Sequence, residues 1–242
     1  MQNLKLILEY DGTDFQGWQT QPNVRTIQGV LEEAITKITG HTTRVIGAGR
    51  TDAGVHATGQ VCNFLTGYSL SFEKMFRSLN GVLPKDVVVR NIEPVDNNFN
   101  ARFQAKKRVY RYIVTQRRRA INQRYMWYYP HPLNIMKMNE ASECLCGEHD
   151  CKSFGCSGSD EKSTLCSIEY ARWEEQGDQL HFIIASNRFL RKMVRSIVGT
   201  LIEVGKEKCS VEEFRKIMEA KDRRCGGNTV PPCGLFLEVV YY

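Results

Sequence analysis

Apolar and polar positions along the first half of the chain follow two different periods. Residues 4–10 alternate apolar and polar side chains, which is typical of a strand with one buried face. Three further stretches have strand-like patterns, at 43–48, 57–65 and 87–92. Apolar residues spaced three and four apart predict two helices, one capped by Thr26 and one that starts near Ser71. The predicted order of elements is β-α-β-β-α-β.

The second half of the chain repeats this order. Four stretches predict strands, at 109–115, 166–174, 179–186 and 235–241. Helical spacing predicts a helix over about 134–146, ended by Gly147, and a longer helix over about 189–204. Ser210 and Glu213 have the spacing of a capping box, which predicts an additional short helix after them.

Two consecutive units of this kind predict an α+β fold built from two related split-βαβ (ferredoxin-like) halves. The expected division is an N-terminal half over residues 1–105 and a C-terminal half over residues 106–242, joined near 95–106. No sequence identity relates the halves, so the repeat is one of architecture. Clefts between such halves are common binding sites.

Composition is that of an ordinary globular protein. Of the 242 residues, 42% are hydrophobic and 25% charged, so a packed core is expected. The net charge of +6 is too small to indicate nucleic-acid binding by itself. The chain opens with a predicted strand instead of a signal peptide, and no apolar run approaches the ~20 residues that span a bilayer. We therefore expect a cytoplasmic protein with no membrane partner.

The nine cysteines are an odd number, and without an export signal we expect them to be reduced thiols. Five of them lie close together with His149, which raises the alternative of a zinc site: Cys144, Cys146, Cys151, Cys156 and Cys166. Their spacing differs from the paired Cys-x-x-Cys pattern, and the predicted helix turns Cys144 and Cys146 in different directions. No metal site is expected there.

The segment 47–60 is rich in glycine and other small residues and lies between two predicted strands. Its one carboxylate is Asp52, two residues from Arg50. One interpretation is a tight turn in which Asp52 binds its own backbone. A dinucleotide-binding loop is a weaker alternative, because Asp52 takes the place of the third glycine and a strand follows instead of a helix.

The nine residues 49–57 resemble the signature of TruA-type tRNA pseudouridine synthases. Further matches follow in the same order over nearly the whole chain, at 10–12, 15–19, 99–103, 110–112, 187–190, 193–199, 221–223 and 234–237. The resemblance implies a pseudouridine-synthase fold with a central cleft and isomerisation of uridine in tRNA without metal or cofactor. It also implies a target in the anticodon stem-loop, at positions 38, 39 and/or 40, and a homodimer that holds one tRNA across both subunits.

The resemblance also assigns roles to individual residues. Asp52 matches the essential aspartate and would act as nucleophile or base at the ribose or uracil. Tyr110 would stack on or hold the target base, although a strand tyrosine can equally be a core residue. Arg50 would contact RNA phosphate or fill the space left by the flipped nucleotide, and Leu235 would line the uracil pocket. Arg195 would be the cation that favours the ionised form of the aspartate.

Basic residues gather in a few places. The predicted helix over 189–204 aligns four of them on one stripe: Arg188, Arg191, Lys192 and Arg195. Two basic runs contain aromatic residues. One begins with Lys106 and Lys107, and the other begins at Arg117. Such runs bind RNA backbone or are simply solvated faces. The main rival to an enzyme is accordingly a non-catalytic RNA-binding module, with tRNA as the expected partner in both cases.

Overall fold

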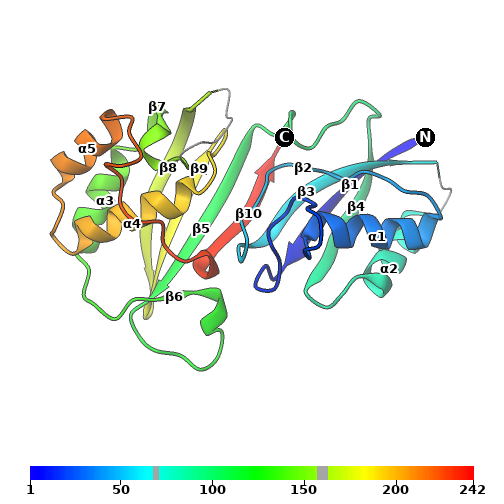
Figure 1. Ribbon diagram of the computed structural model, residues 1–242, viewed down its shortest axis with the longest axis horizontal. Coiled ribbons are helices and arrows are strands. Elements are labelled where there is room, and N and C mark those ends of the chain that lie inside the picture. Colours follow the sequence, from blue (N-terminus) through cyan, green and yellow to red (C-terminus); the bar gives the residue numbers. More distant parts are fainter. Residues whose placement is uncertain (68–70, 157–162) are drawn as a thin grey trace. The chain divides into compact units, whose positions relative to one another are not determined.

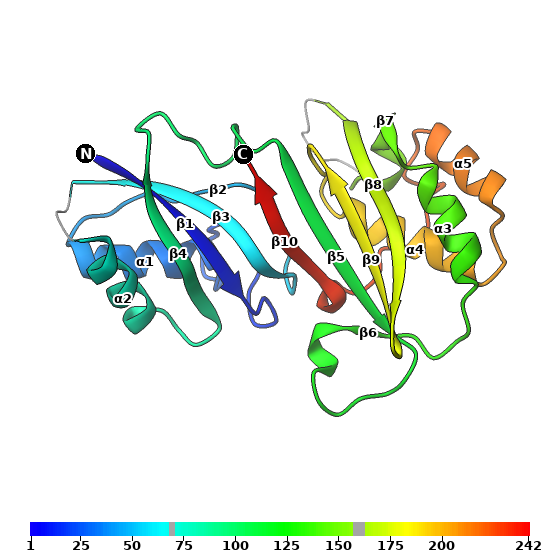
Figure 2. The same ribbon diagram turned by 180° about the vertical axis from the view of Figure 1, so that it is seen from behind.

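A computed structural model describes residues 1–67, 71–156 and 163–242 and divides the chain into two compact units (Figures 1 and 2). Unit 1 comprises Met1–Lys106 and Phe236–Tyr242, and unit 2 comprises Lys107–Leu235. Helices and β-sheet are present in both units, so the α+β class predicted from the sequence is confirmed.

Unit 1 has a sheet in the order β4-β1-β3-β10, with β2 also paired to β3. Its strands are β1 (Gln2–Tyr10), β2 (Ile46–Gly47), β3 (His56–Thr66), β4 (Val87–Val95) and β10 (Leu235–Tyr241). β1 is antiparallel to β3 and to β4, and β2 is antiparallel to β3. This is the strand arrangement of a split βαβ unit, as predicted.

The two helices of unit 1 begin where the sequence indicates. Helix α1 (Ile27–Thr39) is capped by Thr26, whose Oγ1 accepts the Gly29 N–H at 3.2 Å. Helix α2 (Phe72–Val82) begins after Ser71, whose Oγ accepts the Lys74 N–H. The apolar positions of α1 are buried with alternate residues of β1, and they form the core beneath the sheet: Leu4, Leu6, Leu8, Ile27, Leu31 and Ile35.

Unit 2 has an antiparallel sheet in the order β5-β9-β8-β7. Its strands are β5 (Lys107–Thr115), β6 (Trp127–Tyr128), β7 (Gly147–Asp150), β8 (Leu165–Gln176) and β9 (Gln179–Ser186). Its helices are α3 (Ile135–Glu143), α4 (Met193–Gly205) and α5 (Val211–Glu219), with 3-10 turns η1 (Gln123–Tyr125), η2 (Cys151–Phe154) and η3 (Pro232–Gly234). The predicted capping box of α5 is confirmed.

Two predicted helices are shorter than the sequence suggested. Helix α4 starts at Met193, because Lys192 has φ 63° and this left-handed conformation interrupts helical hydrogen bonding. The basic stripe is therefore wrong as a helical face, since its first three members precede α4: Arg188, Arg191 and Lys192. Helix α3 ends at Glu143, so the placement of Cys144 and Cys146 within it is also wrong.

The strand 235–241 was expected to complete the second half of the chain. In the structure β10 runs parallel to β3, with Phe236 opposite His56 and Leu237 opposite Ala57. A Cβ on Gly59 would lie 2.0 Å from Glu238 O, so the absence of a side chain there permits this close approach. All but the first residue of β10 therefore belong to unit 1.

Candidate active site

Asp52 lies in the loop that connects β2 to β3, within the motif 49–57. Its side chain is half-buried, whereas Thr51 before it and Val55 after it are buried. The Asp52 carbonyl accepts the Val55 N–H at 3.2 Å, and Gly54 between them has φ 74°. Asp52 is thus the first residue of a tight turn in which glycine supplies the left-handed position.

Two buried polar side chains hold the residues on the N-terminal side of Asp52. Tyr10 Oη at the end of β1 lies 2.8 Å from Thr51 Oγ1. Gln60 Nε2 on β3 donates to Gly49 O at 2.9 Å and lies 3.5 Å from Tyr10 Oη. Because both side chains are buried, these hydrogen bonds compete little with water and fix the loop against the sheet.

The segment 15–18 holds the loop from another direction. Trp18 N donates to Thr51 O at 3.0 Å, and Gly54 N donates to Phe15 O at 3.3 Å. Gly17 has φ 89°, and a Cβ there would lie 2.6 Å from Thr51 O. Only glycine fits this position, so the backbone of the Asp52 loop is enclosed by a second segment of unit 1.

His56 follows the loop and is the first residue of β3. Its Nδ1 accepts the Gly12 N–H at 3.0 Å and lies 3.1 Å from Asp11 Oδ1. The buried ring stacks on Phe236 with 4.8 Å between centroids. The motif histidine therefore joins the loop after β1 to the strand β10.

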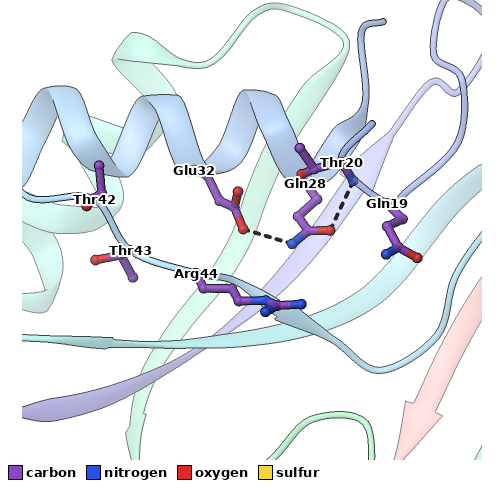
Figure 3. Close-up of a pocket in the computed structure, with 7 residues that line it drawn as sticks. All are labelled: Gln19, Thr20, Gln28, Glu32, Thr42, Thr43 and Arg44. Atoms are coloured by element: carbon purple, nitrogen blue, oxygen red, sulfur yellow. Dashed lines mark hydrogen bonds between the residues drawn. The ribbon is translucent and has the colours of Figure 1, made fainter. Parts of the chain in front are cut away.

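A polar cavity of about 490 Å³ lies beside this region (Figure 3), lined by Gln19, Thr20, Gln28, Glu32, Thr42, Thr43 and Arg44. Gln28 Oε1 accepts the Thr20 N–H at 3.2 Å, and Gln28 Nε2 donates to Glu32 Oε1 at 2.8 Å. The Gln28 backbone N–H donates to Trp18 O at 3.0 Å. Gln28 in the wall of the cavity thereby supports the segment 15–18, which holds the Asp52 loop. None of the site residues proposed from the sequence lines this cavity.

The other expected substrate-binding residues have defined environments. Tyr110 on β5 is buried and meets the Phe189 ring edge-on at 4.9 Å. Arg195 in the first turn of α4 donates from Nε to Val230 O at 2.8 Å. Leu235 is buried at the start of β10, and Arg50 is exposed. Tyr110, Arg195 and Leu235 belong to unit 2, whereas Arg50 shares unit 1 with Asp52.

The basic residues expected to contact RNA differ in exposure. Lys106 and Arg191 are exposed, and Arg188 and Lys192 are partly exposed. Lys107 forms an ion pair with Glu169 at 2.8 Å, so part of its charge is already compensated within unit 2.

Reasoning from the sequence assigned no role to Tyr10, Gln60 or Gly17, although these three residues fix the Asp52 loop. The sequence did contain a signal for two of them, because Tyr10 lies in the 10–12 match to the family and Gly17 lies in the 15–19 match. Gln60 follows the nine-residue signature by three positions.

All nine cysteines lie in the described ranges, and none is in a disulfide. Burial raises the pKa of the Cys62 thiol, and contact with Cys166 together with burial raises that of Cys151. Over residues 1–67, 71–156 and 163–242, no group of three or more metal-ligating side chains comes together. No helix in those ranges is long and apolar enough to cross a membrane.

Comparison with known proteins identifies the class of protein to which this loop and fold belong. The family model described as tRNA pseudouridine synthase matches residues 6–104 and 141–242, which include the Asp52 loop and α4. The chain therefore belongs to this family, whose members isomerise uridine to pseudouridine, and it is an enzyme with tRNA as its substrate.

Individual relatives match over the full length. A protein named tRNA pseudouridine synthase A from Clostridium acetobutylicum is 45% identical over 100% of both chains. A protein of the same name from Thermoanaerobacter sp. strain X514 is 43% identical, again over 100% of both. One from Geobacillus sp. strain WCH70 is 43% identical over 99% of this chain and 98% of the relative.

Proposed function

We propose that this tRNA pseudouridine synthase modifies uridines of the anticodon stem-loop, at positions 38, 39 and/or 40, with Asp52 as its catalytic group. The observation that carries the proposal is the placement of Asp52. It is the one carboxylate of the motif 49–57, its side chain is half-buried, and the residues on both sides of it, Thr51 and Gly54, are held by hydrogen bonds to other segments of unit 1. A carboxylate fixed in this way is suited to act on a bound nucleotide with little loss of freedom on reaction.

The reaction breaks the C–N glycosidic bond, turns the uracil and joins its C5 to the ribose; C5 loses a proton and the freed ring nitrogen gains one, so the product is an isomer. We propose that Asp52 acts as nucleophile or base at the ribose or the uracil ring. The Tyr10 hydrogen bond to Thr51 and the Gln60 hydrogen bond to Gly49 support this role, since they restrain the loop that carries Asp52. No metal or small-molecule cofactor is required by this scheme.

We further propose that four residues bind the target nucleotide. Tyr110 contacts the uracil ring, and Leu235 packs against it. Arg195 supplies positive charge at the reacting group, and the Val230 carbonyl orients its guanidinium. A stacked uridine must leave its helix at a cost of a few kcal/mol, and the exposed Arg50 offsets this by occupying the vacated space or contacting phosphate.

The proposed partners follow from the substrate. A basic track contacts the tRNA backbone through Lys106, Lys107, Arg188, Arg191 and Lys192. The enzyme acts as a homodimer in the cytoplasm, where its tRNA substrate is found.

The experiment that tests the proposal uses unmodified tRNA transcripts whose anticodon stem-loop uridines are substituted one at a time. Wild-type protein and Asp52→Asn are assayed for pseudouridine at each position, without added metal or nucleotide. Product at position 38, 39 or 40 from wild type alone is expected. Product elsewhere in the tRNA rejects the proposed target, product from both proteins rejects the role of Asp52, and bound but unmodified tRNA favours the binding-module alternative.

A further inference from the structure

The segment between β5 and α3 contains a concentration of positive charge that the reaction does not use. Residues 116–124, which we call the arginine loop, contain four arginines and no carboxylate. The loop lies wholly in unit 2, and in Figures 1 and 2 the chain next to β6 extends beyond the ends of that unit's strands.

The base of the arginine loop is anchored. Arg119 forms two contacts with the Asp178 carboxylate, one of them from Nε at 3.2 Å and the other from Nη2. Gln116 Nε2 donates to His131 O at 3.1 Å across the base. Arg119 lowers the pKa of the Asp178 carboxyl, first by its hydrogen bond, so the anchor stays ionised at neutral pH.

The tip of the loop is ordered but exposed. The chain turns at Asn122, which has φ 62°, and the Tyr125 N–H donates to Asn122 O at 3.0 Å. Met126 after the turn is buried, whereas Ile121 before it is 77% exposed. An ordered backbone therefore presents an apolar side chain and its arginine neighbours to solvent.

Arg117 and Arg118 differ from two other surface arginines of unit 2, Arg172 and Arg215. Arg172 and Arg215 each have an acidic partner, at 2.7 Å in Glu174 and 3.2 Å in Glu212. Within the described part of the chain, Arg117 and Arg118 are exposed and have no carboxylate within 4.0 Å. The nearby Asp178 is already bound to Arg119, so the single negative charge of this carboxylate offsets only part of the positive charge of three adjacent guanidinium groups.

An ordered, cationic and protruding loop is complementary to a polyanion. The substrate of this enzyme is tRNA, whose phosphates accept bidentate hydrogen bonds from arginine. We propose that the arginine loop binds the phosphate backbone of tRNA outside the reacting nucleotide, through Arg117 and Arg118, while Arg119 holds the loop in place. This rests on tRNA as the substrate and is independent of the role proposed for Asp52.

Full-length wild type is compared with the double variant Arg117→Ala/Arg118→Ala. The matched control is Arg172→Ala/Arg215→Ala, which also removes two surface arginines of unit 2. The dissociation constant for an unmodified tRNA transcript is measured at a series of KCl concentrations. Each phosphate contact adds roughly 0.7–0.9 to the slope of the logarithm of the dissociation constant against the logarithm of the salt concentration. The loop variant is expected to lower this slope by about 1–2 and to weaken binding about tenfold or more at low salt.

The control double variant should keep the wild-type slope, and Arg117→Lys/Arg118→Lys should restore most of it, because lysine retains the charge. A loop variant with the wild-type slope overturns the proposal. The proposal is also overturned if the loop variant keeps the wild-type salt dependence of tRNA binding but no longer binds anionic phospholipid vesicles that wild type binds. A lower slope in a preparation that forms no pseudouridine supports the arginine loop while rejecting the proposed reaction.

Discussion

The Asp52 loop and the arginine loop are both polar connections beside strands, but they are held in opposite ways. In the Asp52 loop, the residues around the carboxylate bond to buried groups of β1, β3 and the segment 15–18. In the arginine loop, Gln116 and Arg119 bond to other parts of unit 2 at the base, the tip turns at Asn122, and Arg117, Arg118 and Ile121 are exposed. A group that reacts must be fixed, whereas a group that finds phosphate must be accessible.

The largest effect is expected for Asp52→Asn. This substitution keeps the shape of the side chain and removes its charge, so turnover should fall by at least ~10²–10⁴-fold while tRNA affinity stays nearly constant. Single-turnover pseudouridine formation and a binding titration measure the two separately. Asp14→Asn is the matched control, because Asp14 is exposed in the same unit and should leave the rate unaltered. Equal losses in both variants would mean that net charge, not the carboxylate, matters.

A smaller loss is expected for Gly17→Ala. The added Cβ would approach Thr51 O to 2.6 Å at a positive φ, so we expect destabilisation by about 1–3 kcal/mol together with slower turnover. Gly81→Ala in α2 is the control, because a Cβ there meets no described atom within 4 Å. It should stabilise the helix by up to about 1 kcal/mol. Thermal unfolding of both variants checks the opposite signs, and a neutral Gly17→Ala would contradict the enclosed loop.

Tyr10→Phe removes the hydroxyl that contacts Thr51 and should act more mildly. The hydroxyl contacts Gln60 as well as Thr51, and a loss of about 0.5–1.5 kcal/mol for the shorter bond predicts a fall in kcat of roughly 2–12-fold with KM little changed. Tyr128→Phe on β6 serves as the control, since that side chain is exposed. A rise in KM without a fall in kcat would place Tyr10 in binding instead of positioning.

The smallest effect is expected at the anchor of the arginine loop. Asp178→Asn should increase hydrogen exchange of residues 116–119 and leave exchange of residues 49–55 unchanged. The pKa of Asp178 is lowered in the folded protein, so the ion pair is complete above the ordinary carboxyl pKa and is lost only as the pH falls through the lowered value. Wild type should therefore show the same increase only in acid, and unchanged exchange in the variant would remove Asp178 as the anchor.

The local elements of the fold could be predicted from the sequence because their signals are local. Thr26, Ser71 and the pair Ser210 and Glu213 mark helix starts through hydrogen bonds to residues three positions away. The start of α4 was missed because a single left-handed residue, Lys192, has no comparable signature.

Long-range partners could not be predicted in the same way. The period of residues 235–241 predicts a strand, but it holds no information about which strand lies next to it. Asp52 was found from its motif, whereas the roles of Tyr10 and Gln60 depend on contacts across 41 and 11 positions. Such contacts become visible only when the strands are paired.

The pairing of β10 with β3 has a consequence for synthesis on the ribosome. Strand β10 contacts β3 at His56 and Ala57, Tyr242 Oη donates to Ala101 O, and Lys106 N donates to Tyr241 O. Residues 1–106 of unit 1 are synthesised first. Residues 236–242, which pair with one edge of β3, are synthesised well over a hundred residues later. Until then the nascent chain leaves the edge of β3 unpaired at His56 and Ala57, beside the loop that bears Asp52, and an unpaired strand edge can pair with other chains.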